Sequence, residues 1–125
     1  MPEASLVNVV ILNWNGLPHV LRTLDAVLSS NYPALSVILV DNGSTDASVK
    51  MIQGRFPDVI CQLAGKNLGY AAGNNLGLRQ AMQLESEYVL LLNDDTVITP
   101  DMISALVLHL QQNQEDHFIF LMYLY

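Results

Sequence analysis

Acidic and amide side chains follow three apolar runs of this 125-residue sequence. Asp94 and Asp95 follow the run at residues 88–92 after a single residue, Asn93, and Asp41 and Asn13 end two earlier runs. Two adjacent carboxylates repel each other unless a cation or hydrogen-bond donors lie beside them. Hard divalent cations such as Mg²⁺ and Mn²⁺ prefer oxygen ligands and share them with water and substrate phosphates. We therefore expect a metal site at Asp94 and Asp95, ahead of the alternative that the pair only forms a turn.

Asp41 opens a short polar turn with Asn42 and Gly43. An acid at the end of a strand is suited to accept a hydrogen bond from a nucleobase or a ribose hydroxyl, and glycine lets the backbone come close to a ligand. The same three residues also form an ordinary turn. The residues alone leave both interpretations open. Trp14 is open in the same way, because it either stacks on a base or anchors its loop as a buried aromatic.

A segment rich in glycine and asparagine, residues 67–77, opens a predicted helix. The first N–H groups of a helix attract anions, so this segment is a candidate for a diphosphate. Glycines four residues apart also let a helix lie close against a sheet, and this packing role is preferred for Gly73 and Gly77. Amides are mediocre helix formers, so at least one of Asn74 and Asn75 is expected to face the ligand crevice or the adjoining loop.

Four repeats of an apolar strand and an amphipathic helix position these side chains. The strands are expected at residues 7–12, 37–40, 59–63 and 88–92, and the helices at about 17–28, 44–56, 70–84 and 99–110. Pro18 is expected in the first turn of the first helix, Ser44 or Thr45 as the cap of the second, and Thr99 as the cap of the fourth. The alternation predicts an α/β fold, a mostly parallel doubly wound sheet with helices on both faces. Ligands bind such sheets beyond the carboxyl ends of the strands, where the strand order reverses.

Composition and charge narrow the functional classes. Twelve acidic and five basic residues give a net charge of −7, which offers no basic surface to nucleic acid or to an anionic membrane. A hydrophobic content of 51% indicates a globular domain. The lone Cys61 is expected to be a buried structural thiol. His19, His109 and His117 share no metal-ligand spacing, and His19 and His109 are expected far from the strand ends.

Both ends of the chain carry expectations of their own. The N-terminus lacks the basic segment of a secretory signal, so a cytoplasmic location is expected, with the membrane surface left open. The eight apolar residues 118–125 are fewer than the ~20 that a membrane helix needs. We expect one domain over residues 1–116, followed by an apolar tail at 117–125. This tail is either an edge strand, through which the chain could form a homo-oligomer, or a continuation unrelated to the fold.

Four stretches, in this order and spacing, resemble family-2 glycosyltransferases of the GT-A fold, particularly the rhamnosyltransferase-like members. They are VVILNWNG at 9–16, VILVDNGSTD at 37–46, KNLGYAAGNNLGL at 66–78 and YVLLLNDDTVITPDMI at 88–103. The resemblance implies a Rossmann-like GT-A fold that binds a nucleotide sugar. It also implies that the fold is truncated here, because family enzymes continue with an acceptor site and an acidic general base.

The resemblance further implies a nucleoside diphosphate sugar as donor, with dTDP- and UDP-sugars as first choices. It implies Mn²⁺ or Mg²⁺ on the diphosphate and inverting transfer of the sugar to an acceptor hydroxyl. Asp41 matches the acid that contacts the base, and Asp95 matches the metal ligand. The other positions implied in binding the nucleotide sugar are Asn13, Asn15, Asn42, Asn67, Gly69, Asn74, Asn93 and Asp94. Asn93 departs from the family pattern, because it stands where the first acid of the Asp-x-Asp element is expected.

Two functions remain open for the chain. The first is the donor-binding part of a glycosyltransferase, whose general base is absent from this sequence and whose catalytic residues therefore stay unknown. The second is a catalytically inactive fragment that folds or self-associates. Metal-dependent binding of a nucleoside diphosphate distinguishes the two. A phosphoryl-transfer site made of Asp41, Asp94 and Asp95 is disfavoured, because no suitably placed lysine accompanies these acids.

Overall fold

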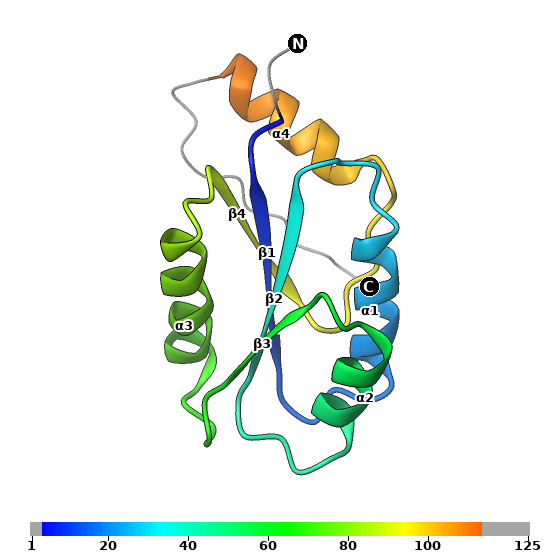
Figure 1. Cartoon of the computed structure of the whole chain (residues 1–125), viewed down its shortest axis with the longest axis vertical. Coiled ribbons are helices and arrows are strands. Elements are labelled where there is room, and N and C mark those ends of the chain that lie inside the picture. The colour runs from blue at the N-terminus through cyan, green and yellow to red at the C-terminus, as the bar shows by residue number, and fades with distance from the viewer. Residues whose placement is uncertain (1–3, 114–125) are drawn as a thin grey trace.

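The computed structural model describes residues 4–113, in which a parallel four-stranded sheet is flanked by helices (Figure 1). The strands are β1 (Val7–Asn13), β2 (Leu35–Asp41), β3 (Ile60–Leu63) and β4 (Tyr88–Asn93). The helices are α1 (His19–Leu28), α2 (Ser48–Arg55), α3 (Tyr70–Gln83) and α4 (Met102–Gln112). The strand order is β3-β2-β1-β4, with every pair parallel. The predicted doubly wound α/β fold is confirmed, and the order reverses between β1 and β4.

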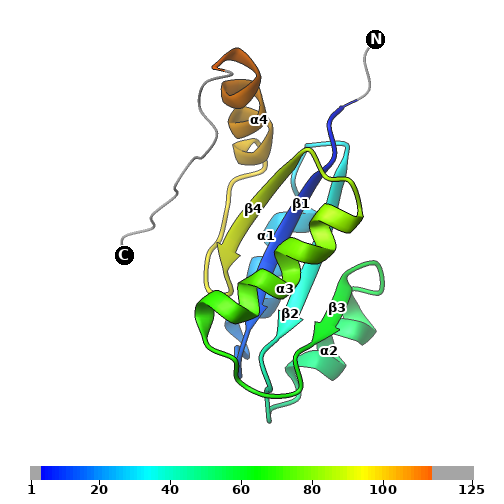
Figure 2. The ribbon, with the colours of Figure 1, turned by 90° about the vertical axis from the view of Figure 1, so that its left-hand side faces the viewer.

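The core lies on both faces of β1 and β2, which explains their nearly continuous apolar sequences. Alternate residues of β1 point to opposite faces. Val9 and Ile11 belong to the larger cluster, to which α1, α2 and α4 contribute, whereas Val10 packs with Ile38 and Ala81 on the side of α3. Figure 2 shows α3 in front of the sheet and α1 behind it. The central strands are therefore held rigidly between two layers of helices.

The α3 face of β4 is open, although the sequence of this strand is as apolar as that of its neighbours. Val89 and Leu91 lie on this face and are 36% and 41% exposed. The reason is the position of α3, which packs chiefly over β1 and β2 (Figure 2). An apolar strand sequence thus predicts the strand correctly but overestimates how completely this one is covered.

Three helices begin differently from the sequence prediction. Pro18 is the N-cap residue of α1 and lies outside its first turn, and α2 and α4 begin later than expected, after Ala47 and Asp101. The hydroxyls expected to cap these two helices bind acids instead. Ser44 Oγ donates to Asp41 Oδ1 at 2.6 Å, and Thr99 Oγ1 donates to Asp101 Oδ1 at 2.8 Å. Serine and threonine side chains make such local bonds in competition with helix capping.

Two glycines let α3 lie directly on the sheet. A Cβ atom at Gly77 would stand 2.3 Å from Val10 Cγ1 and 3.0 Å from Val40 Cγ2, and one at Gly73 would stand 2.6 Å from Leu12 Cδ1. These distances are too short for any side chain at the two positions without movement of the helix or the strands. The preferred sequence interpretation, a packing role for both glycines, agrees with this geometry.

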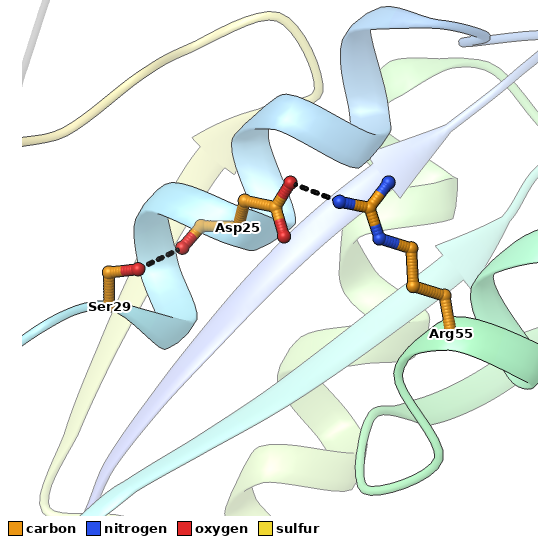
Figure 3. A network of polar contacts seen from close by, with 3 residues as sticks. All are labelled: Asp25, Ser29 and Arg55. Atoms are coloured by element: carbon orange, nitrogen blue, oxygen red, sulfur yellow. Dashed lines mark hydrogen bonds and ion pairs between the residues drawn. The ribbon is translucent and has the colours of Figure 1, made fainter.

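An exposed ion pair joins α1 to α2 on the outer surface (Figure 3). Arg55 Nη2 lies 2.7 Å from Asp25 Oδ2, and Ser29 Oγ donates to the main-chain oxygen of Asp25 at 2.7 Å. Both charged side chains are about half exposed. Water screens such a pair strongly, so we expect the buried faces of α1 and α2 to supply most of their stability.

The predictions for the end of the chain fall on residues that the structure does not describe. The boundary after residue 116, the apolar tail at 117–125 and an oligomer through that tail all lie outside residues 4–113. Within those residues, none of the helices has both the length and the apolar character needed to cross a membrane.

Candidate functional site

The strand register brings the predicted polar residues to one edge of the sheet. Asn13 pairs with Asp41 at the ends of β1 and β2, and Asn93 pairs with Leu12 at the end of β4. The loops that follow these strands lie at the same edge, which includes the point where the strand order reverses. This is the crevice position at which doubly wound sheets bind ligands.

A buried hydrogen-bond network holds the carboxylate of Asp41, which is only 5% exposed. Its Oδ1 accepts from Asn13 Nδ2 at 3.0 Å and from Ser44 Oγ at 2.6 Å, and its Oδ2 accepts from the Ser44 N–H at 3.0 Å. Asn13 Nδ2 also donates to Ser48 Oγ at 2.8 Å. Because a carboxylate oxygen has two lone-pair positions, Oδ2 keeps one position for a further donor.

Asn15 ties the loop after β1 to the loop after β2. Its backbone has a φ of +49°, a left-handed conformation that asparagine tolerates better than most residues. Its Oδ1 accepts from the N–H groups of Thr45 and Asp46 at 2.7 and 3.1 Å, while its own N–H donates to Ser44 Oγ at 2.9 Å. Thr45 is therefore held by Asn15 and does not cap a helix.

Asn42 makes the corresponding connection from β2 to the loop before α3. Its Nδ2 donates to Asn67 Oδ1 at 3.1 Å and to the Gly69 carbonyl at 3.2 Å, and its Oδ1 accepts from the Leu68 N–H at 2.9 Å. Asn67 Oδ1 accepts a second hydrogen bond from the Gly69 N–H at 2.8 Å. The loop that opens α3 is thus fixed to the end of β2 by side-chain amides.

The carboxyl group of Asp94 has a pKa above its ordinary value. Burial of this half-buried side chain raises its pKa, and the charge of Asp95 raises it further. His19 and the N–H of Trp14 act in the opposite direction but do not cancel the increase. Such a shift is common where acidic groups form a functional site, and a bound cation would favour the ionised form.

The oxygen atoms beside Asp94 fit a hard divalent cation. Asn13 Oδ1 is buried and has no hydrogen-bond partner among residues 4–113. A Cβ atom at Gly16 would lie 2.3 Å from this oxygen and 2.7 Å from Asp94 Oδ2, so the two oxygens face the same small space. The described residues contain no group of three His, Cys, Asp or Glu side chains that could hold a metal. This donor set suits Mg²⁺ or Mn²⁺, which complete their coordination with water and phosphate.

The first turns of α3 add further polar groups to this edge. The Asn74 side chain is buried, with only 5% of the residue exposed, and its Nδ2 has no hydrogen-bond partner within the described part of the chain. Asn75, by contrast, is exposed. The Tyr70 hydroxyl donates to Asn93 Oδ1 over a long 3.4 Å. Of the two asparagines, Asn74 is therefore the buried one, and the expectation that at least one of them faces the ligand crevice or the adjoining loop stays a prediction.

Sequence reasoning missed or misplaced several side chains. His19 was expected far from the strand ends, which is wrong, because α1 begins at His19 and places it near Asp94. Trp14 is 54% exposed, so the alternative of a buried anchor is wrong. Cys61 is only partly buried, though burial still raises the pKa of its thiol. Ser44 was considered only as a helix cap, although serine side chains also bond to polar groups nearby in the chain, and here the Ser44 hydroxyl and N–H both donate to Asp41.

A doubly wound parallel sheet with acids and amides at its strand-end edge defines the chain as a Rossmann-like α/β protein, a class in which ligands bind at that edge. A family model described as Glycosyl transferase family 2 matches residues 8–125. The chain therefore belongs to glycosyl transferase family 2.

Two curated bacterial relatives illustrate the range of similarity. The N-acetylglucosaminyl-diphospho-decaprenol L-rhamnosyltransferase of Mycobacterium tuberculosis is 30% identical over 111 residues, which cover 82% of this chain and 36% of the relative. Glycosyltransferase GlyG of Streptococcus pneumoniae is 29% identical over 119 residues, which cover 90% of this chain and 38% of the relative. The chain thus spans little more than a third of the length of these relatives.

Solved structures show the same fold. Residues 1–349 of S. aureus TarS, in complex with UDP-GlcNAc, match with a TM-score of 0.76 and 19% identity, over 87% of this chain and 32% of that one. The mannosyltransferase PcManGT of Pyrobaculum calidifontis, in complex with GDP-Man and Mn²⁺, matches with a TM-score of 0.74 and 27% identity, over 86% of this chain and 33% of that one. The α/β, Rossmann-like GT-A fold is therefore established for this chain.

Proposed function

We propose that the chain is the donor-binding part of an inverting, metal-dependent glycosyltransferase and binds a dTDP- or UDP-sugar. The observation that supports this proposal is the placement of Asn13, Asp41 and Asn93 at the ends of neighbouring parallel strands, with Asp94 and Asp95 next in the chain after Asn93. The ligands named for TarS and PcManGT, UDP-GlcNAc and GDP-Man with Mn²⁺, support it. The acceptor site and the general base would come from protein beyond this sequence.

The roles of the residues follow from their surroundings. Asp41 would use the free lone-pair position on Oδ2 to accept a hydrogen bond from an N–H of the base. Trp14, exposed in the neighbouring loop, would stack on the base. Asn13 and Asn15 would act by holding Asp41 and the adjoining loops in place. The base would thus bind between the ends of β1 and β2.

Asp95 and Asp94 would hold the cation, with Asn13 Oδ1 facing the same space as Asp94 Oδ2. Asn93 and Asn74 would lie nearer the donor sugar. A bound Mn²⁺ or Mg²⁺ neutralises the charge that develops on a diphosphate leaving group. The residues of this chain contribute carboxylate oxygens for that cation, an acceptor for the base, and the amides of Asn67 and the first turn of α3. We expect this chain to bind the donor and to hydrolyse it at most slowly with water.

The test is calorimetric titration of the folded chain with UDP and with dTDP, each with and without Mn²⁺. We expect metal-dependent binding with a dissociation constant on the order of micromolar, which corresponds to about 8 kcal/mol. Asp95→Asn should abolish the dependence on Mn²⁺, and Asp41→Asn should weaken binding by roughly tenfold or more, since it replaces an ionised acceptor. Asp58→Asn is the matched control, because this exposed acid lies just before β3, at the opposite edge.

The second candidate is the inactive fragment that folds or self-associates, and the exposed apolar face of β4 favours it. Among residues 4–113, β4 is also an edge strand of the sheet and carries no charged residue, and such strands are prone to pair with another chain. If the folded chain binds neither nucleotide, with or without Mn²⁺, and light scattering shows a stable oligomer, this second function replaces the first.

A further inference from the structure

All polar atoms of the Asn42 side chain are engaged inside the protein. The residue is 2% exposed, both of its amide hydrogens have acceptors, and its oxygen accepts from Leu68. We propose that Asn42 is a positioning residue, which fixes the amide of Asn67 so that Asn67 Nδ2 donates to an oxygen atom of the nucleotide. The identity of the ligand rests on the proposed function, whereas the orientation of Asn67 is a property of the ligand-free chain.

The hydrogen bonds determine which way the Asn67 amide faces. Its Oδ1 accepts from Asn42 Nδ2 at 3.1 Å and from the Gly69 N–H at 2.8 Å. These two bonds use the full acceptor capacity of an amide oxygen. Turning the amide over would place its NH₂ group against two donors. Asn67 is therefore held with Oδ1 toward the protein, and Nδ2 is the group that this exposed side chain offers to a ligand.

The orientation of Asn42 is fixed by the same reasoning. One side of its amide meets two acceptors, Asn67 Oδ1 and the Gly69 carbonyl, and the other side meets a donor, the Leu68 N–H. Only an amide satisfies all three groups, because a carboxylate has no donor and a hydroxyl has one. The residue at position 42 thus decides whether Asn67 presents its NH₂ group or its oxygen to a ligand.

The consequence is a complementary pair of groups at the ligand edge. Asp41 offers an acceptor, and Asn67 offers a donor. An oxygen of the nucleotide, either a base carbonyl or a phosphate oxygen, would accept from Asn67 Nδ2. An aspartate at position 67 would satisfy Asn42 and Gly69 equally well but would repel such an oxygen. This difference separates the role of Asn67 in binding from the role of Asn42 in positioning.

Three isosteric changes test the proposal. Asn42→Asp keeps the acceptor for Leu68 but faces two acceptors with a carboxylate oxygen. Asn67→Asp keeps both internal bonds and removes only the outward donor. Asn75→Asp adds the same charge at an exposed position of α3 and is the control. Asn42→Ser, which removes the donors without adding charge, serves if Asn42→Asp does not fold.

The first measurement is amide hydrogen exchange of the ligand-free chain by NMR. Asn42→Asp should accelerate exchange of the Gly69 N–H by about tenfold or more and shift the side-chain amide signals of Asn67, because the loop loses two bonds. Asn67→Asp should leave the Leu68 and Gly69 exchange rates as in the parent. If Asn42→Asp and Asn42→Ser leave Gly69 and Asn67 unchanged, Asn42 does not position Asn67 and the inference is overturned.

The second measurement is the affinity for UDP with Mn²⁺. We expect a loss of about tenfold for Asn42→Asp and for Asn67→Asp, no loss for Asn75→Asp, and little further loss in the double variant, because both changes act through one amide. An equal loss with uridine would place the accepting oxygen on the nucleoside, and a loss with UDP alone would place it on the phosphates. Asn67→Asp binding like the parent would refute the ligand contact. Failure of the parent to bind any nucleotide would refute the proposed function and this contact together. The exchange measurement on the ligand-free chain would then still show whether Asn42 holds Asn67 and Gly69 in place.

Discussion

The close contact between α3 and the sheet predicts a large difference between two glycine substitutions. Gly77→Ala places a Cβ atom 2.3 Å from Val10 Cγ1 and 3.0 Å from Val40 Cγ2. Val10 is fully buried, and its branched side chain is restricted within the strand, so it has no free rotation to relieve the contact. Gly54 lies in α2 and has no atom within 4 Å of its hypothetical Cβ. It is therefore a matched control in another helix.

The magnitude follows from two opposing effects. Replacing a helical glycine by alanine favours the helix by about 1 kcal/mol, so Gly54→Ala should raise the free energy of unfolding by up to that amount. Overpacking of a rigid core costs about 1–3 kcal/mol. Since the propensity gain is common to both variants, the difference between them isolates the steric effect. Gly77→Ala should be less stable than Gly54→Ala by about 1–3 kcal/mol.

Urea unfolding followed by circular dichroism measures both variants. Val10→Ala in the Gly77→Ala background supplies a further check, because it removes the two γ carbons that the new methyl group meets. The double variant should be more stable than the sum of the two single effects predicts. Equal stability of Gly77→Ala and Gly54→Ala, with no coupling to Val10, would refute the claim that α3 lies directly on β1.

Three further outcomes are expected. Gly16→Ala should lower the free energy of unfolding by about 1–3 kcal/mol, because its Cβ would meet Asn13 Oδ1 at 2.3 Å and Asp94 Oδ2 at 2.7 Å; a urea titration that matches the parent would contradict this. Asp94→Asn should stabilise the metal-free protein near neutral pH, because the raised pKa of Asp94 means that its ionisation opposes folding. That gain should fade as the pH falls to the ordinary range of aspartate, and thermal unfolding as a function of pH would show a constant gain if the reasoning is wrong. Arg55→Gln should change the free energy of unfolding by no more than about 0.5 kcal/mol, since its ion pair with Asp25 is half exposed, and a larger loss in urea unfolding would show that the pair matters.

The order and type of the elements could be predicted from the sequence. Runs such as residues 7–12 and 37–40 are apolar throughout because helices cover both faces of the central strands, and this burial is the physical origin of the pattern. The sequence places Asn13 and Asp41 at the ends of two parallel strands, and in the structure the register pairs these two residues. Period and strand direction thus suffice to locate the candidate site.

The details of the site depend on contacts between distant residues. Ser44 binds Asp41, and Ala47 is the N-cap residue of α2. Local helix propensity could not predict this arrangement. The burial of Asn42 could not be predicted in this way either. Asn42 was expected to touch the nucleotide, but in the structure its hydrogen bonds are internal. Side-chain amides both donate and accept, so their role is decided only when the partners from other loops are in place.

The three hydrogen bonds of the Asn42 side chain also bear on the chemical durability of the protein. Asn42 and Asn15 each precede a glycine, the sequence in which an asparagine side chain is attacked most readily by the following backbone nitrogen. In the folded chain Asn42 is held by three hydrogen bonds, and Gly43, at a φ of +83°, lies against the backbone of residues 66–67. Deamidation requires the Asn42 side chain and the Gly43 backbone nitrogen to move toward each other, and these contacts prevent that movement. Chains that spend time unfolded would accumulate an acid at position 42, and with it the loss of the bonds to Asn67 and Gly69, so repeated unfolding would erode the ligand edge irreversibly while the sheet continued to form.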